Sequence, residues 1–201
     1  MAVTVLDDRT ALVLIDLQAG TLAAPTVPHP AADVVARAAE LAAAFRESGL
    51  PVVLVRMTNS PDGADATPGR SEAARLAGGA RRPYDLGPIA EPLAGYEGDV
   101  LVVKRAWGAF HGTDLDLQLR RRGITQIVLG GIATSLGVES TARAAHEHGY
   151  HVSFAVDAMT DIREEAHRHS VSYLFPLIGE PGTVEEIVGL LKSRPTGATS
   201  G

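Results

Sequence analysis

The feature that most constrains the fold is a series of five short, nearly continuous apolar runs. A run of this kind is typical of a strand that is buried on both faces of a parallel sheet. The five runs are residues 11–18, 51–57, 99–105, 127–133 and 151–158. Helical periodicity follows at residues 31–48, in a helix capped by Thr113 and closed by residues 120–122, and at residues 136–148, 161–175 and 183–192.

This alternation predicts an α/β fold. We expect a three-layer α/β/α sandwich around a doubly wound, mostly parallel sheet of about five or six strands, with a short edge strand around residues 177–178. A chain of 201 residues suits one domain with its own core. We therefore expect a single domain over residues 1–193 and a disordered tail over residues 194–201, which are small and polar.

The charge balance argues against two classes of partner. The formal net charge is −6, so neither nucleic acid nor an anionic membrane is an expected partner. The N-terminus lacks the pattern of a signal peptide, and no apolar run is long enough to span a bilayer. We expect a cytoplasmic protein, and the absence of cysteine agrees with that location.

Charged residues stand at the carboxyl ends of two apolar runs. Asp16 comes at the end of the first run, where a working cleft and an ordinary loop cap are equally good interpretations. Lys104 ends the third run, and only it and Lys192 are lysines among eighteen basic residues. A lysine kept inside an apolar strand calls for a reason. Trp107 and Phe110, which follow it, either wall a pocket or pack in the core.

A long polar loop runs from residue 58 to about residue 85. Loops of this length are usually functional lids or disordered segments. This one carries four arginines, and any of them can bind a substrate carboxylate through two hydrogen bonds. For each arginine taken singly, a solvated side chain is the favoured interpretation. The four are Arg70, Arg75, Arg81 and Arg82.

Residues 130–143 join the fourth run to a helix through a turn of small residues. In an open parallel sheet, ligands bind at the carboxyl ends of the strands, where free N–H groups of a helix start suit an anion. From this segment alone, a plain strand-to-helix connection is the favoured interpretation. The segment nevertheless resembles the signature of the isochorismatase-like hydrolase superfamily, in which a cysteine nucleophile precedes Val-Glu-Ser-Thr-Ala-Arg. The patterns at residues 14–18 and 102–110 resemble that superfamily as well.

The resemblance departs from the superfamily at the nucleophile. The position of the cysteine is held by Gly137, and the chain contains no cysteine, so covalent thiol chemistry is excluded. True isochorismatases are similar in having glycine there, and they cleave a vinyl ether with water to release pyruvate. The resemblance implies Asp16, Lys104 and Gly137 as the catalytic trio, meeting in one crevice if the first, third and fourth strands are neighbours.

In such a mechanism Asp16 is the general acid, and burial can raise its pKa. We expect Lys104 mainly as a ligand for a substrate anion, and the backbone N–H groups of Leu136 and Gly137 as donors to a carboxylate or oxyanion. The resemblance also implies a cis peptide between Ile132 and Ala133. The expected substrate-binding residues are Gln18, Trp107, Phe110, Ala133, Thr134, Ser135, Leu136 and Arg82.

No metal and no other cofactor are expected. Nicotinamidases, a branch of the same superfamily, place metal-binding histidines after the second strand, and residues 58–62 contain none. The histidines at positions 146, 148, 151, 167 and 169 are expected to be exposed or to cap helices, because helical positions two apart point in different directions. A small, carboxylated substrate and a homodimer or homotetramer are expected.

Two alternatives stay open. Isochorismatases have Tyr-Ser-Ala-Phe where this chain has Trp-Gly-Ala-Phe at residues 107–110, and their loop glutamine and arginine lack clear counterparts here. The chain is therefore also compatible with a hydrolase of another small amide or ester. The second alternative is a catalytically disabled member that binds a small molecule or serves as a structural subunit.

Overall fold

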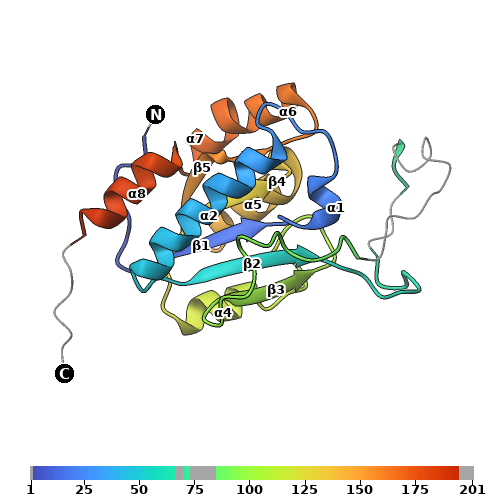
Figure 1. Cartoon of the computed structure of the whole chain (residues 1–201), viewed down its shortest axis with the longest axis horizontal. Coiled ribbons are helices and arrows are strands. Elements are labelled where there is room, and N and C mark those ends of the chain that lie inside the picture. Colours follow the sequence, from blue (N-terminus) through green and yellow to red (C-terminus); the bar gives the residue numbers. More distant parts are fainter. Residues whose placement is uncertain (1, 67–69, 73–84, 195–201) are drawn as a thin grey trace.

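A six-stranded parallel sheet forms the centre of the protein (Figure 1). The computed structural model describes residues 2–66, 70–72 and 85–194. The strand order is β3-β2-β1-β4-β5-β6, and every pairing is parallel. The strands are β1 (Thr10–Ile15), β2 (Val52–Met57), β3 (Val100–Lys104), β4 (Gln126–Ile132), β5 (His151–Thr160) and β6 (Glu180–Gly182). The predicted α/β class and doubly wound sheet are confirmed.

The strand order creates a switch point between β1 and β4. The chain builds the sheet outward from β1 through β2 to β3, then returns to add β4 on the other side of β1. Connections leave β1 and β4 in opposite directions, which opens a crevice at their carboxyl ends. All residues of both strands are buried, as their continuous apolar runs predicted.

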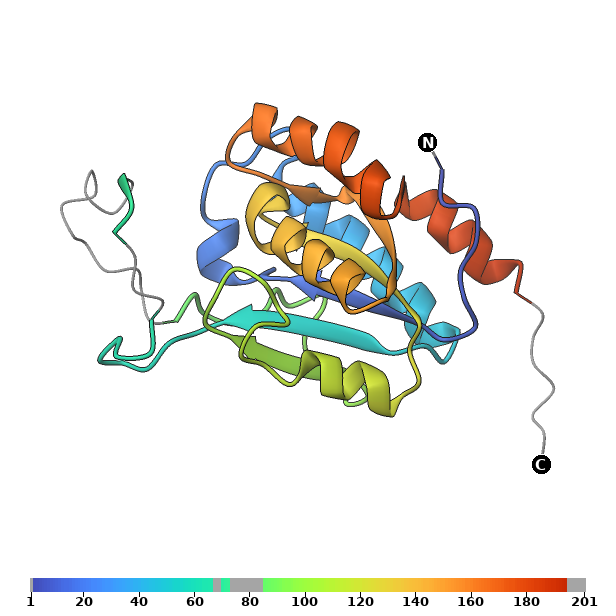
Figure 2. The same cartoon turned by 180° about the vertical axis from the view of Figure 1, so that it is seen from behind.

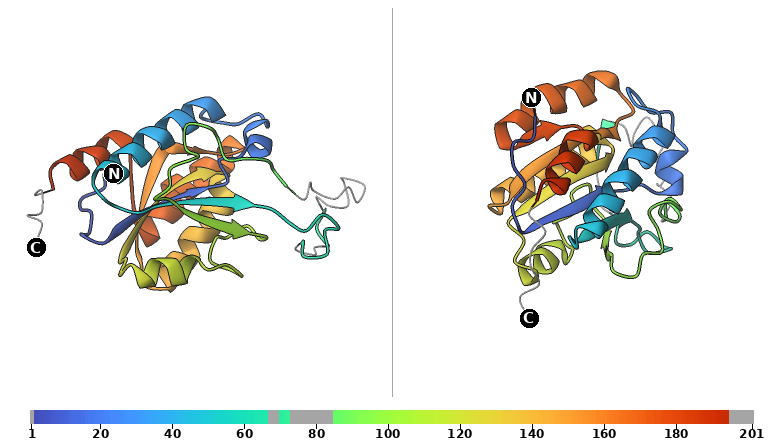
Figure 3. Two further views of the ribbon diagram at one scale, coloured as in Figure 1. Left: turned by 60° about the horizontal axis from the view of Figure 1, so that its bottom comes forward. Right: turned by 60° about the vertical axis from the view of Figure 1, so that its left-hand side comes forward.

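Helices cover both faces of the sheet, as Figure 3 shows in side view. On one face lie α2 (Ala31–Glu47) and α8 (Val184–Lys192), which share an apolar core with β1 and β2. The opposite face, turned forward in Figure 2, carries α4 (Leu115–Arg121), α5 (Glu139–Glu147) and α7 (Phe175–Ile178). These two covered faces make the three layers that the alternation of elements predicted.

Three predicted element boundaries differ from the structure. The edge strand is β6, whereas residues 177–178 belong to α7. The Glu-Pro-Gly sequence of β6 carries no strand signal, since Pro and Gly are depleted in strands. The helix expected from residue 136 starts earlier, as a π-helical turn η1 (Thr134–Val138) that leads into α5. The helix expected over residues 161–175 is α6 (Glu164–His169) followed by a second π-helical turn, η2 (Ser170–Leu174).

The helix ends show one full cap and one partial cap. Thr183 accepts from the N–H of Glu186, whose side chain accepts from the N–H of Thr183 in return, so α8 begins with a capping box. The hydroxyl of Thr113 accepts from the N–H of Leu115 at the start of α4. A further short helix, α1 (Ala19–Leu22), follows β1. Among the described residues no helix is both long and apolar enough to cross a membrane.

The chain is placed as far as Arg194. Its guanidinium donates to the backbone oxygen of Asp7 at 3.0 Å, so this residue does not belong to a disordered tail. The rest of the expected tail, residues 195–201, lies outside the described residues.

Gly131 in β4 allows the close approach of β1 and β4 at the switch point. Its φ is +123°, and a Cβ there would overlap the backbone oxygen of Ile15 and lie 2.6 Å from its nitrogen. We predict that Gly131→Ala lowers the free energy of unfolding by about 3 kcal/mol, because the strands must separate.

Gly189 provides the matched control for that substitution. It lies within α8, and a Cβ there would meet no atom within 4 Å. Gly189→Ala should raise stability by up to about 1 kcal/mol, since alanine is the better helix former. Denaturant unfolding of both variants tests the pair, and equal effects would contradict the predicted close approach.

Candidate active site

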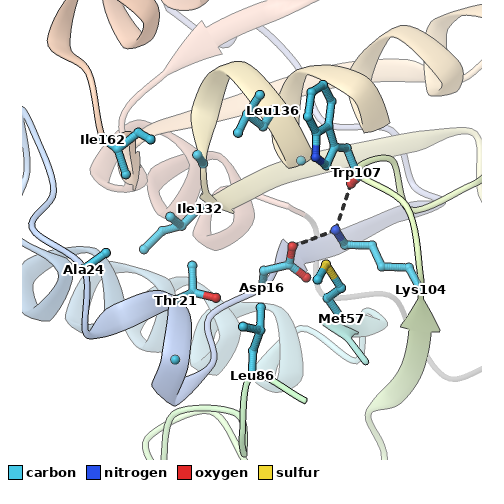
Figure 4. Close-up of a pocket in the computed structure, with 13 residues that line it drawn as sticks. Asp16, Thr21, Ala24, Met57, Leu86, Lys104, Trp107, Ile132, Leu136 and Ile162 are labelled. Carbon is cyan, nitrogen blue, oxygen red and sulfur yellow. Dashed lines mark hydrogen bonds and ion pairs between the residues drawn. The ribbon is translucent and has the colours of Figure 1, made fainter. Parts of the chain in front are cut away.

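A pocket of about 320 Å³ lies at the switch point, above the carboxyl ends of β1, β2 and β4 (Figure 4). Its walls are mostly apolar, and two of its described lining residues, Asp16 and Lys104, are charged. The lining residues are Asp16, Gly20, Thr21, Ala24, Met57, Leu86, Lys104, Trp107, Ile132, Ala133, Leu136, Gly137 and Ile162.

Asp16 follows directly after β1 and forms the floor of the pocket. Its φ is +51°, in the left-handed region that aspartate tolerates better than most residues. This conformation ends the strand, while the Asp16 N–H still donates to the oxygen of Val55 on β2 at 3.0 Å. The residue is only 7% exposed, so its carboxyl group is almost removed from water.

Lys104 reaches Asp16 from the end of β3. The predicted neighbourhood is only partly correct, since β1 and β4 are adjacent but β2 lies between β1 and β3. The long lysine side chain spans that gap and brings Nζ to 2.6 Å from Asp16 Oδ2. Lys104 is 1% exposed. The two residues therefore form a buried ion pair across the end of β2.

The ammonium group of Lys104 is fully engaged inside the protein. Besides Asp16, it donates to the backbone oxygens of Ala106 at 3.1 Å and Trp107 at 2.8 Å. An ammonium has three donors, and these contacts use all of them. Lys104 therefore offers no donor to a substrate anion in this arrangement, which corrects the role of direct anion ligand expected from the sequence.

The carboxyl group of Asp16 is poised to titrate close to neutral pH. Burial raises the pKa of Asp16 from 3.8 to about 6, against the opposing effect of Lys104. Oδ2 accepts from Lys104, whereas Oδ1 is buried and has no hydrogen-bond partner among the described residues. The group can therefore hold or release a proton on Oδ1 without losing its contact with Lys104.

Gly137 leaves open the space beside this carboxyl group. It lies in η1, and a Cβ there would be 3.6 Å from Asp16 Oδ2 and 2.9 Å from Ile15 Cγ2. A side chain at this position would crowd Ile15 and fill the space next to the acid. The glycine thus gives a water molecule or a substrate atom access to Asp16.

Several of the predicted binding residues do line the pocket. Ala133 and Leu136 flank Gly137, and the peptide between Ile132 and Ala133 is cis, as expected. Trp107 is 53% exposed and forms a wall, which decides between the two interpretations of this side chain. The N–H of Leu136 donates to the oxygen of Ala133 at 3.1 Å. Of the two expected backbone donors, only Gly137 therefore stays a candidate.

Four other predicted binding residues are not among the described residues that line the pocket. Gln18 is buried, with its Oε1 accepting from the N–H of Met57 at 2.7 Å and its Nε2 donating to the oxygen of Gly87 at 2.8 Å. Phe110 packs in the core against Tyr150. The Ser135 N–H donates to Asp161 Oδ2 at 2.7 Å, and Thr134 is fully buried.

Among the loop arginines, Arg70 is exposed and does not line the pocket. Arg82, the one expected to bind substrate, lies outside the described residues, as do Arg75 and Arg81.

A buried histidine supports the turn that carries Gly137. Thr134 donates its hydroxyl hydrogen to the oxygen of Thr160, so it accepts from Nδ1 of His167 at 2.9 Å. His167 is buried, which contradicts the expectation of an exposed or capping residue, whereas His146, His148, His151 and His169 are exposed. Burial, followed by the nearby His29, lowers the pKa of His167. A neutral His167 therefore donates from Nδ1 to Thr134 and stabilises the turn η1.

Sequence reasoning found Trp107, Ala133 and Leu136 but missed other apolar residues of the pocket walls. Met57 ends β2. Ile162, which is 58% exposed, is the second residue after β5. Both are close to the carboxyl ends of strands, which was the signal that could have found them. Thr21 and Leu86 come from a short helix and a loop, where no periodicity marks a residue that faces a pocket.

Comparison with known proteins identifies the family of this site. The model of the isochorismatase domain matches residues 10–186. The chain belongs to the isochorismatase family. It is 47% identical to the isochorismatase family protein YecD of Escherichia coli O157:H7, over 90% of this chain and 96% of that protein. Like other members of the family, it is a hydrolase.

Two further comparisons show the range of the isochorismatase family. The structure of a family member from Burkholderia thailandensis is 43% identical and superposes with a TM-score of 0.88, covering 96% of this chain and 100% of that one. The ureidoacrylate amidohydrolase RutB of Methylobacterium radiotolerans is 28% identical, over 82% of this chain and 71% of that protein. Family membership therefore establishes that the chain is a hydrolase. The bond that it cleaves has to be inferred from the site.

The raised pKa of Asp16 predicts how stability depends on pH. A carboxyl group whose pKa is higher in the folded than in the unfolded protein loses its stabilising contribution as pH rises through the folded value. For a shift from 3.8 to about 6, the wild type should lose about 2 kcal/mol relative to Asp16→Asn between pH 4 and pH 7. Asparagine suits the positive φ and cannot titrate, and denaturant unfolding at both pH values measures the difference. A constant difference between the two proteins would show that Asp16 is not shifted.

Proposed function

We propose that this isochorismatase-family protein hydrolyses a vinyl ether without a covalent nucleophile, with Asp16 as the general acid and pyruvate as a product of an isochorismate-type substrate. The observation that carries the proposal is the buried carboxyl group of Asp16. Its pKa is raised to about 6, and it stands beside a glycine where a nucleophile would otherwise be. An acid of this pKa is partly protonated near neutral pH and is also strong enough to transfer its proton.

The proposed reaction begins with proton transfer from Asp16 to the terminal carbon of the enol ether. The carbon that bears the ether oxygen becomes an oxocarbenium ion, and water adds to it while its proton returns to Asp16. The resulting hemiketal collapses to pyruvate and an alcohol. Each step leaves the protein unmodified, so the lack of cysteine is no obstacle.

Lys104 has a supporting role in this scheme. It donates to Asp16 Oδ2 at 2.6 Å, and it can do so whether or not Oδ1 carries a proton. The ammonium favours the ionised carboxylate that remains after the proton has left. Its two backbone acceptors, Ala106 and Trp107, hold it in place, so little reorganisation accompanies the transfer.

A second candidate function is the hydrolysis of a small amide by water. It is favoured by the likeness to RutB, which is named a ureidoacrylate amidohydrolase. In that reaction the ionised Asp16 would act as a general base on a water molecule beside Gly137. The two candidates require opposite protonation states of the same carboxyl group, and this difference can be measured.

The first test is release of pyruvate from isochorismate and from related enol ethers. We expect the wild type to form pyruvate and Asp16→Asn to lose at least about a hundredfold in kcat/KM, because the variant has no proton to donate. The control is Asp33→Asn, which alters an exposed acid on α2 outside the pocket lining and should retain activity. Absence of pyruvate with every enol ether would contradict the proposal and favour the amide hydrolase or a non-catalytic member.

The pH profile is the second test, because it separates acid from base catalysis. With Asp16 as the general acid, kcat/KM should be level below pH 6 and fall about tenfold for each pH unit above it. With Asp16 as the base, the profile should rise to a plateau above pH 6. A profile that rises would exclude the proposed acid and support the amide alternative.

A further inference from the structure

Among the described residues, the charges around the pocket form a small set. Asp16 and Lys104 are the charged residues of the described lining. Asp161, after β5, is occupied by backbone N–H groups of residues 135, 162 and 163. On β2, Arg56 pairs with Asp85, and after β3, Arg105 pairs with Asp65. His167 faces Thr134 and not the pocket lining.

The net charge of this set depends on one proton. With Asp16 ionised, the pair with Lys104 is neutral. With Asp16 protonated, the ammonium of Lys104 is a buried positive charge with no anionic partner among the described lining residues. A buried charge without a partner is costly, and the cost is relieved when an anion comes close.

The geometry also indicates which oxygen of a protonated Asp16 carries the proton. Lys104 donates to Oδ2 and has no lone pair to accept, so a proton on Asp16 belongs on Oδ1. Oδ1 is buried and has no partner among the described residues. A protonated Asp16 therefore presents one donor that the described part of the protein leaves unsatisfied, within a few ångströms of an uncompensated cation.

From these contacts we infer that the pocket binds a carboxylate and a proton together, the proton on Asp16 Oδ1 and the carboxylate as its hydrogen-bond acceptor and as the counter-charge of Lys104. This inference rests on the proposed function in taking Asp16 as the acid, and it names the substrate class as a small carboxylate, one carboxylate group of which takes this place. Since Lys104 keeps its three internal acceptors, the anion is selected by the charge of the pair and needs no direct contact with the ammonium.

Through this coupling, binding of the substrate itself promotes the protonation of Asp16. An anionic ligand raises the pKa of Asp16 above its value of about 6 in the free protein, so the acid is protonated when an anion is bound. An uncharged ligand of the same shape has no such effect and meets an ionised Asp16 at neutral pH. The rate of reaction therefore distinguishes an anionic ligand from an uncharged one, even where the apolar parts of both fit the pocket equally well.

A matched pair of ligands tests this inference without any turnover. Benzoate and benzamide are alike in size, but only benzoate is charged between pH 6.5 and pH 8.5. Binding is measured by titration calorimetry and by the fluorescence of Trp107, which is the single tryptophan of the chain and lines the pocket. We expect the Kd of benzoate to rise about tenfold per pH unit in this range, and that of benzamide to stay constant.

The same titrations count the proton directly. Calorimetry at pH 7.5 in buffers of different ionisation enthalpy should show uptake of nearly one proton per benzoate and none per benzamide. In Asp16→Asn, which is uncharged at every pH, benzoate should bind without the tenfold slope and without proton uptake. Circular dichroism confirms that the variant is folded, and the buffer series on the wild type stands by itself if it is not.

The outcomes separate this inference from the proposed function. Proton-coupled binding of benzoate without pyruvate release would support the inference and contradict vinyl-ether hydrolysis. Pyruvate release together with pH-independent binding of benzoate would support vinyl-ether hydrolysis and contradict the inference. Failure of benzoate to bind at pH 5.5 up to millimolar concentrations would overturn the inference, because there Asp16 is already protonated.

Discussion

The carboxyl edge of this sheet depends on one buried ion pair, between Asp16 and Lys104. Removing two charges from water costs several kcal/mol for each ion, and the pair offsets this only through close contact and additional hydrogen bonds. Lys104 has both, with Asp16 Oδ2 at 2.6 Å and the oxygens of Ala106 and Trp107 as further acceptors. Asp16 makes fewer contacts, since its Oδ1 has no hydrogen-bond partner in the described part of the chain. Burial, which the contact with Lys104 only partly offsets, keeps the pKa of this carboxyl group at about 6.

The glycine at the position of the nucleophile is better understood as the source of an open space than as a loss of function. Gly137 lies where a side chain would contact both Ile15 and the carboxyl group of Asp16. The pair beside it is complete and buried, although a protein that had no use for an acid would be more stable with apolar residues there. The preserved pair and the open space together agree with the proposed hydrolysis, in which water reacts without a covalent nucleophile.

Much of the fold could be predicted from the sequence, since strands that are buried on both faces leave continuous apolar runs. β6 could not, because its three residues have no strand character and are recruited by pairing with β5. At the site, Asp16 and Lys104 were candidates because they stand at the carboxyl ends of strands, whereas Gly137 was indicated only by the resemblance to the isochorismatase-like superfamily. The positions of Gln18 and Phe110 were not, because the direction of a side chain beyond a strand end follows from tertiary packing. The engagement of all three donors of Lys104 could be seen only in three dimensions.

The pocket draws its chemistry and its walls from different parts of the chain. Asp16 and Lys104 stand at the ends of β1 and β3, and Gly137 lies in the π-helical turn η1 after β4, whereas Leu86, Trp107 and Ile162 come from connecting segments. Loops tolerate replacement far better than buried strands do. The residues that we propose to handle the proton can therefore stay constant while the walls diverge, so that relatives with this framework can differ in what they accept without any change in how they react.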